Sequence, residues 1–135
     1  MKLSTRSRYG TRMMLDLASH YGEGFVQMED ISRRQGISFK YLEQLVPPLK
    51  KANLIESVRG PKGGHRLAKH PKKIVVGEIV RVLENDPSLS RCIENPDLCE
   101  RSKACPTRRV WDMATDAVYD TLNSVTLADL AERSG

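Results

Sequence analysis

Apolar residues recur at intervals of three and four along most of the chain, which predicts a mainly helical fold. The first such stretch follows Ser4, a good N-cap residue, and ends at Gly22. A short second helix is expected over Met28–Gln35, and after Gly36 a third helix begins at Ser38. Two helices joined by a glycine-containing turn form a candidate helix-turn-helix, although ordinary helical cores contain the same pattern.

Pro47 and Pro48 interrupt the pattern inside the third predicted helix. Each proline lacks a backbone N–H and crowds the turn before it. We therefore expect a kink, or a helix that ends near Val46 and a new turn that starts at Pro48. The N-terminal part of this helix, where base contacts are expected, is unaffected in either case.

A basic hairpin is expected after the third helix. Residues 54–59 and 65–68 have the pattern of two short strands, and they are joined by a tight turn of sequence GPKGG. A recognition helix followed by such a hairpin is the outline of a winged helix, in which Arg59, Lys62 and Arg66 can lie along phosphates or in a minor groove. A plain surface hairpin is the alternative.

The second half of the chain predicts helices around a segment rich in Pro and Cys. A fourth helix is expected over residues 74–83, a long amphipathic helix over 107–125, and a short final helix that Thr126 caps. The long helix carries an apolar stripe made of Val110, Met113, Ala114, Ala117, Val118, Thr121, Leu122 and Val125. Such a stripe needs a partner, which is either the protein's own core or a second copy.

These elements predict a mainly α fold with a small β-wing. We expect a winged helix-turn-helix over residues 1–75, a connecting helix and cysteine loop over 76–106, and a dimerisation helix with a C-terminal cap over 107–135. Charge follows a similar division, because residues 1–75 carry 15 Lys/Arg against 6 Asp/Glu, whereas residues 76–135 carry 7 against 11. This asymmetry indicates that only the first half meets a polyanion, with solvated surface as the alternative.

Composition argues against several other classes of protein. Aromatic residues make up 5% of the chain, too few for a base-stacking binder of single strands. No apolar run approaches the ~18 residues of a membrane span, and the basic N-terminus lacks the apolar core of a secretory signal, so we expect a cytoplasmic protein without a membrane partner. We expect no enzyme, because the chain has no C-x-x-C pair, no nucleotide-binding glycine loop and no spacing typical of a catalytic triad.

Three cysteines, Cys92, Cys99 and Cys105, form a C-x6-C-x5-C cluster. In a reducing compartment such a cluster favours metal binding or redox chemistry over a disulfide framework. Zinc usually takes tighter pairs and a fourth Cys or His, and no histidine lies in this half of the chain. An iron–sulfur cluster accepts wider spacing. A thiol redox switch, a zinc site and purely structural cysteines are the alternatives.

Several specific motifs occur in order along the chain, namely MKLSTRSRYG, ISFKYLEQLV, RGPKGG and VGEIVRVLE. With the cysteine segment and the long helix, they make nearly the whole chain resemble the IscR-like regulators of the bacterial Rrf2 family. The resemblance implies a homodimeric winged-helix transcription factor, which we expect to be a repressor, whose long helices pair across a twofold axis. It also implies an iron–sulfur cluster held by Cys92, Cys99 and Cys105 that alters binding to a double-stranded DNA operator.

The same motifs indicate which residues meet DNA. Ser38, Tyr41, Glu43 and Gln44 match the family's recognition-helix segment, Arg59, Pro61 and Gly63 match its wing, and Lys40 and Lys62 complete the expected set. Chemically, Gln44 can pair with adenine through two hydrogen bonds, and Glu43 can accept one from cytosine. Arg59 can enter a narrow minor groove.

The chain departs from the family pattern at the fourth cluster ligand. Regulators of iron–sulfur biogenesis have a histidine three residues after the last cysteine, where this chain has Arg108, and nitric-oxide-sensing relatives have an aspartate where it has Arg8. The fourth ligand and the choice between 2Fe–2S and 4Fe–4S therefore stay open. A third branch, similar to repressors of cysteine metabolism, shares the YLEQLV and VRVLE stretches and can respond through a regulatory protein partner. Control by thiol redox or a partner, and a winged helix that binds no DNA, are the alternatives.

Overall fold

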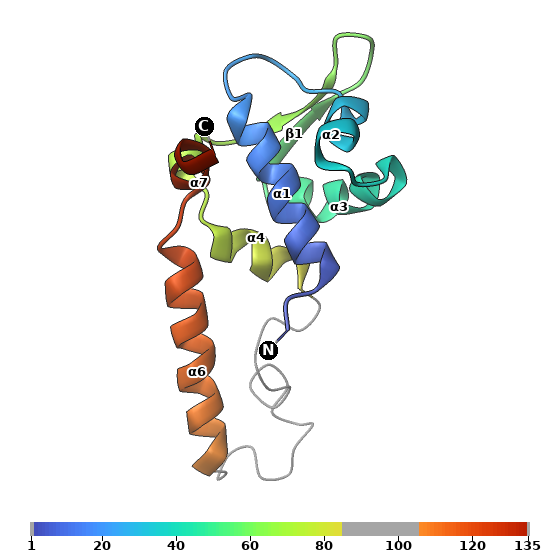
Figure 1. Ribbon diagram of the computed structural model, residues 1–135. Coiled ribbons are helices and arrows are strands. Elements are labelled where there is room, and N and C mark those ends of the chain that lie inside the picture. Colours follow the sequence, from blue (N-terminus) through green and yellow to red (C-terminus); the bar gives the residue numbers. More distant parts are fainter. Residues whose placement is uncertain (1, 85–105, 135) are drawn as a thin grey trace.

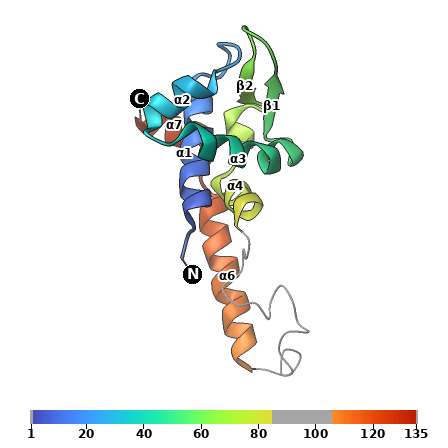
Figure 2. The same cartoon turned by 90° about the vertical axis from the view of Figure 1, so that its right-hand side faces the viewer.

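The structure, a computed structural model, describes residues 2–84 and 106–134. Its elements are α1 (Thr5–Ser19), α2 (Met28–Gln35), α3 (Phe39–Lys51), β1 (Ile55–Val58), β2 (Gly64–Leu67), the 3₁₀ turn η1 (Pro71–Lys73), α4 (Val76–Leu83), α6 (Pro106–Asn123) and α7 (Leu127–Ser134). Helices α1 to α4 and the hairpin gather into one bundle, beyond which the N-terminal half of α6 extends (Figures 1 and 2). The predicted mainly α fold with a small β-wing is confirmed.

The hydrophobic core lies where α1, α3, α4 and the base of the hairpin meet. Its fully buried side chains are Met13, Met14, Leu17, Ile31, Leu42, Leu45, Leu49, Leu54, Ile55, Ile74, Ile79 and Leu83. Helix α7 folds back on α1 and η1, and its Leu127 joins this core. The predicted division of the chain at residues 75 and 106 stays a prediction, but the described C-terminal end packs on the first helix.

Capping residues begin and end the helices where the sequence indicates. Ser4 and Ser38 are the N-caps of α1 and α3, and the hydroxyl of each accepts a hydrogen bond from a backbone N–H three residues on. Gly36 ends α2 in the left-handed conformation with a φ of 65°. At the start of α7 the predicted cap Thr126 forms a reciprocal capping box with Asp129, with bonds of 2.9 and 3.1 Å.

Helix α3 continues through both prolines to Lys51, so of the two predicted outcomes the helix end near Val46 is wrong, and the kink stays a prediction. The prolines remove the N–H groups that would bond to the carbonyls of Glu43 and Gln44, both of which are exposed residues. Burial of Leu45, Val46 and Leu49 compensates, because these side chains hold the last turns against the core.

The hairpin, which we call the wing, is antiparallel and pairs Ile55 with Leu67 through Val58 with Gly64. Its returning strand is also bridged to the segment before α2, because Val26 and His65 exchange backbone hydrogen bonds of 2.7 and 2.9 Å. A side-chain amide bond from Gln27 to the carbonyl of Gly63 adds to this bridge. The wing is therefore fixed to the helix-turn-helix rather than only tethered to its end.

Helix α6 packs on α4 through a face that carries the buried side chains of Thr115 and Tyr119. The guanidinium of Arg81 on α4 lies 4.2 Å from the centroid of the Tyr119 ring. Part of the predicted apolar stripe faces another way, since Val110 is 54% and Met113 63% exposed, whereas Ala114, Val118, Leu122 and Val125 are half-buried. Within the described residues, the core is therefore not the partner that the exposed part of this stripe needs.

Candidate nucleic-acid interface

The turn between α2 and α3 is built from local hydrogen bonds. Gly36 reverses the chain, and the Ser32 hydroxyl donates to the carbonyl of Ile37 at 2.6 Å. The Ser38 hydroxyl accepts from the backbone N–H of Tyr41 at 3.1 Å. The proposed DNA-contact residue Ser38 thus also starts α3 and fixes the direction in which it leaves the turn.

Helix α3 presents a polar face opposite the one that it buries. Lys40, Glu43 and Gln44 are all exposed, and they lie within its first two turns. Tyr41 lies beside them and is half-buried, because its ring meets the ring of Tyr9 edge to face at 5.7 Å. The structure therefore brings the predicted helix residues together on one surface, although their contact with DNA stays a prediction.

The predicted DNA-contact residues at the tip of the wing differ in their exposure. Arg59, Pro61 and Lys62 are exposed, whereas Gly63 is buried at a position where a Cβ would overlap the backbone of Val58. Gly63 is therefore required for the shape of the turn, whatever it contacts. Arg66, which the sequence also suggests for phosphate contact, already has partners on the other face of the wing.

Those partners are Glu56 and Phe25. The Arg66 guanidinium lies 2.9 Å from a Glu56 carboxylate oxygen and 4.4 Å from the centroid of the Phe25 ring. In the antiparallel register Glu56 faces Arg66 on one side of the hairpin, while Ser57 faces His65 on the other. The Ser57 side borders a groove shared with α3, so this side is the one available to a ligand that also meets α3.

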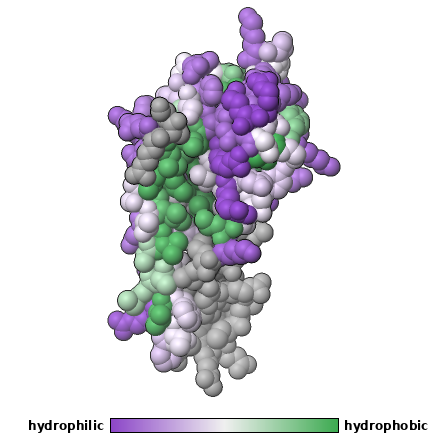
Figure 3. Space-filling model, in the orientation of Figure 1, coloured by the Kyte–Doolittle hydropathy of each residue, from purple (hydrophilic) through white to green (hydrophobic). Residues whose placement is uncertain are grey.

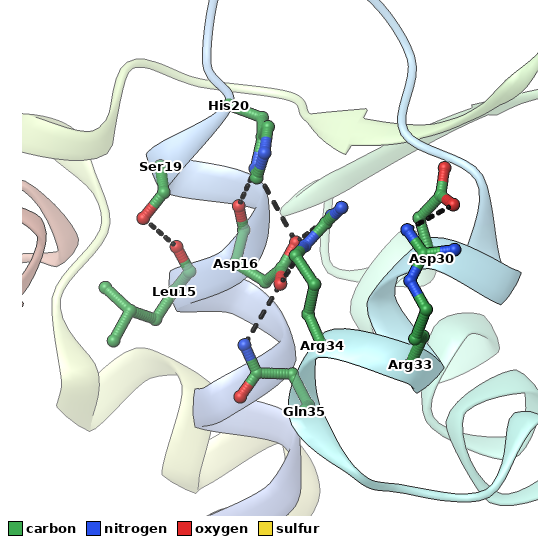
Figure 4. Close-up of polar contacts among 8 residues, drawn as sticks. All are labelled: Leu15, Asp16, Ser19, His20, Asp30, Arg33, Arg34 and Gln35. Atoms are coloured by element: carbon green, nitrogen blue, oxygen red, sulfur yellow. Dashed lines mark hydrogen bonds and ion pairs between the residues drawn. The ribbon is translucent and has the colours of Figure 1, made fainter.

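An ion pair between the buried Asp16 and the partly exposed Arg34 holds the end of α2 against α1. Asp16 is 4% exposed, and its carboxylate accepts bonds of 3.0 and 2.6 Å from Arg34 and 3.0 Å from the Gln35 amide (Figure 4). Burial raises the pKa of Asp16, but the hydrogen bonds from Arg34 and Gln35 outweigh burial and hold this pKa below its ordinary value. Because Arg34 and Gln35 directly precede the turn, this ion pair sets where α3 begins.

Asp16 is absent from the residues that the sequence suggested for function. It lies among the buried residues Met13, Met14 and Leu17 of α1. A carboxylate on an otherwise apolar helix face is buried only when it is paired. This position is the signal that would have identified it, but the sequence does not say that Arg34 is the partner.

A second carboxylate joins the end of α4 to the start of α1. Glu84 accepts hydrogen bonds from the Ser4 hydroxyl at 2.7 Å, from the Ser4 backbone N–H at 3.3 Å and from the Ser7 hydroxyl. Burial opposes ionisation, but these bonds hold the pKa of Glu84 below its ordinary value. Glu84 is the last described residue before the segment that contains the three cysteines.

The predicted cluster ligands Cys92, Cys99 and Cys105 lie outside the described residues. Within residues 2–84 and 106–134, no group of three or more His, Cys, Asp or Glu could hold a metal ion. No helix in those ranges combines the length and apolar character that a membrane crossing requires.

Comparison with known proteins agrees with this geometry. The model of the Rrf2 family, described as an iron-dependent transcriptional regulator, matches residues 3–133. The protein named rrf2 of Nitratidesulfovibrio vulgaris is 49% identical over 130 residues, which cover 96% of this chain and 87% of that protein. IscR of Pectobacterium atrosepticum, named an HTH-type transcriptional regulator, is 41% identical over 130 residues, which cover 96% of this chain and 79% of that protein.

Two solved structures are similar along almost the full length. T. potens IscR has a TM-score of 0.78 and 40% sequence identity, and the match covers 100% of this chain and 89% of that chain. CymR, described as the global cysteine regulator of B. subtilis, has a TM-score of 0.79 and 41% identity, with 98% of both chains covered. A match over nearly the whole chain, to a fold with this helix-turn-helix and wing, shows that the protein belongs to the Rrf2 family of transcriptional regulators.

Proposed function

We propose that this Rrf2-family regulator is a repressor that binds a double-stranded DNA operator as a homodimer and responds to an iron–sulfur cluster. The observation that carries the DNA-binding part is the relative position of α3 and the wing. Glu43 of α3 and Arg59 of the wing both border one groove. A helix in a major groove and a hairpin in the adjacent minor groove need this side-by-side arrangement.

The exposed residues fit the parts of a duplex that they would meet. In the proposed complex, Gln44 bonds to N6 and N7 of an adenine, and Glu43 accepts a hydrogen bond from N4 of a cytosine. Arg59 enters the minor groove. Lys40 and Lys62 add contacts to phosphates, which position the protein without reading sequence.

Gln44→Ala is expected to relax the preference at one base pair per half-site, at a cost of about 1–3 kcal/mol in discrimination. The operator is first selected from a pool of random duplexes, and affinities are then measured by fluorescence anisotropy at several salt concentrations. Lys62→Ala is the contrasting variant, because loss of a phosphate contact should weaken all sequences alike and reduce the salt slope by about one. A wild-type protein without sequence preference would favour an interaction module over a DNA reader.

Homodimerisation is supported by the exposed apolar residues of α6. Val110, Trp111 and Met113 are 54%, 44% and 63% exposed. Figure 3 shows hydrophobic side chains gathered along the column that α6 forms. Exposed apolar patches of this kind mark interaction sites, and a second copy would place two α3 helices on a twofold operator.

Val110→Glu is expected to shift the protein from dimer to monomer, because it places a carboxylate in the proposed apolar interface. The dissociation constant of the dimer, measured by analytical ultracentrifugation, should rise at least about tenfold, which corresponds to roughly 1.4 kcal/mol. Asp116→Ala on the polar side of α6 is the control and should leave it unchanged. Equal behaviour of the two variants would assign the dimer contact to another surface.

The proposed cluster is held by Cys92, Cys99 and Cys105, which are thiolate ligands of the kind that iron–sulfur clusters take. When bound, it supplies a group whose oxidation state and occupancy respond to iron and oxidants. The description of the matching family as iron-dependent supports this assignment.

A second candidate is control without a cluster, by thiol oxidation or by a protein partner. The similarity to CymR, a structure described as a cysteine regulator, favours it. The two candidates share the same DNA-binding half. The visible spectrum of protein purified without oxygen separates them, because only an iron–sulfur cluster gives broad charge-transfer absorption together with acid-labile sulfide.

A further inference from the structure

A groove of about 510 Å³ separates α3 from the wing. Glu43 and Lys50 line it from α3, and Ser57, Arg59 and His65 line it from the wing. We propose that this groove binds a phosphate of the DNA backbone, with Lys50 as the counter-charge and His65 as a hydrogen-bond donor. The proposal rests on the DNA-binding function proposed above and adds a site to it.

The wall of the groove on the wing side is a cross-strand pair that orients the imidazole. Ser57 lies directly opposite His65, and its hydroxyl is 2.7 Å from the ring atom Nδ1. Since Nδ1 is engaged with Ser57, the other ring nitrogen, Nε2, is the one left for a ligand. The backbone of His65 is bonded to Val26, so the ring projects from a fixed strand.

Charges around the imidazole favour an anion. The cations that border the groove are Lys50 and Arg59, and Glu43 is the one acidic residue among the described residues that line it. Burial of the ring and then the charge of Lys50 hold the pKa of His65 below its ordinary value, while Glu43 acts in the opposite direction. In the free protein at pH 7 the ring is therefore neutral, and the tautomer in which Nδ1 accepts from the Ser57 hydroxyl donates a hydrogen bond from Nε2.

The shape of a duplex explains why the anion is a backbone phosphate. If α3 occupies a major groove and Arg59 at the wing tip enters the adjacent minor groove, the strand that separates these grooves must pass between α3 and the wing. The groove lies in that position. Phosphate contacts fix the register of a protein on its duplex. This site would therefore fix the positions of α3 and the wing relative to the two grooves of the duplex.

The test uses the full chain and the operator selected from random duplexes. At pH 7.5 and about 0.15 M salt, Lys50→Gln is expected to weaken binding about 5–10-fold and to reduce the salt slope by about one, with sequence preference unchanged. His65→Ala is expected to weaken binding about 3–10-fold through loss of a charge-assisted hydrogen bond. Lys72→Gln, which removes an equal charge from an exposed residue of η1, is the control.

The pH dependence of affinity provides a readout that a purely structural role would not change. A phosphate beside the imidazole favours its protonated form, so the wild-type affinity should rise as the pH falls from about 7.5 to 6, and His65→Ala should lose part of this rise. If the wild type binds its operator and the Lys50→Gln and His65→Ala variants bind it as tightly as Lys72→Gln does, the phosphate site alone is overturned. A wild type that binds no duplex would overturn the proposed function and this site with it.

Discussion

Asp16→Asn is expected to lower the free energy of unfolding by about 1.5–3 kcal/mol, because it removes the buried carboxylate that accepts charge-assisted hydrogen bonds from Arg34, whose own side chain is 33% exposed. An amide at residue 16 also presents N–H groups to the Gln35 amide, which itself donates to the carboxylate. The end of α2 should then loosen, and operator affinity should fall with it because α3 follows directly. Urea unfolding at pH 7 measures the first effect, and anisotropy with the selected operator measures the second.

Asp30→Asn is the matched control. Asp30 also pairs with an arginine of α2, Arg33, but these side chains are 41% and 72% exposed. Such a surface pair contributes about 0–1 kcal/mol, so the control should change little. Equal losses in the two variants would show that the Asp16 pair does not hold α2 in place.

The contribution of Asp16 should also depend on pH. Its pKa is lowered in the folded protein, so the stability that it adds is complete above its unfolded pKa of about 3.9 and is lost as the pH falls through the folded pKa. The difference in unfolding free energy between the wild type and Asp16→Asn should therefore persist at pH 5 and above. It should shrink below about pH 4.

The parts of the fold that local sequence determines were predictable. The apolar spacing indicates which faces of α3 and α4 are buried, and Ser4, Ser38 and Gly36 mark where helices begin and end. The path of α3 through Pro47 and Pro48 was not predictable, because it depends on tertiary packing that compensates for two missing hydrogen bonds. Local rules describe the cost of a proline but not the burial that offsets it.

The candidate site also contains residues that the sequence predicts and contacts that it does not. Gln44 and Arg59 follow from motifs, because helix position and turn sequence place them on the surface. Two other features depend on contacts between segments that are distant in sequence, such as the bridge from Val26 to His65. These features are the ion pair of Asp16 and the orientation of His65 toward α3. Apolar periodicity does not encode these contacts. The ion pair of Asp16 with Arg34 and the groove between α3 and the wing are therefore found only in the structure.

The connectivity of the chain suggests how a cluster would influence α3. The cysteine segment begins directly after Glu84 and ends directly before α6. Glu84 is bonded to the start of α1, and α1 in turn holds the end of α2 through Asp16. In our proposal, gain or loss of the cluster therefore acts on two elements at once, the α1–α4 junction and the proposed dimer helix, and shifts the spacing of the two α3 helices.

Cys99→Ala is expected to abolish the visible absorption of the protein purified without oxygen, together with its bound iron and acid-labile sulfide. A cluster that has lost one of three thiolate ligands is not retained, since the segment offers no other cysteine. The operator affinity of the variant should equal that of wild-type protein from which the cluster has been removed. Both should differ from the cluster-loaded wild type by about 5–150-fold, the usual range of coupling between two sites.

Ser102→Ala, a change of similar size in the same segment, is the control and should keep the chromophore and its effect on binding. A wild type that stays colourless after reconstitution with iron and sulfide, yet binds its operator, would contradict the cluster and favour thiol or partner control. If the chromophore disappears in Cys99→Ala while affinity is unchanged, the cluster exists but does not regulate DNA binding. Spectrum and affinity must therefore change together, because the proposed mechanism requires that the cluster's occupancy alter the geometry of the dimer.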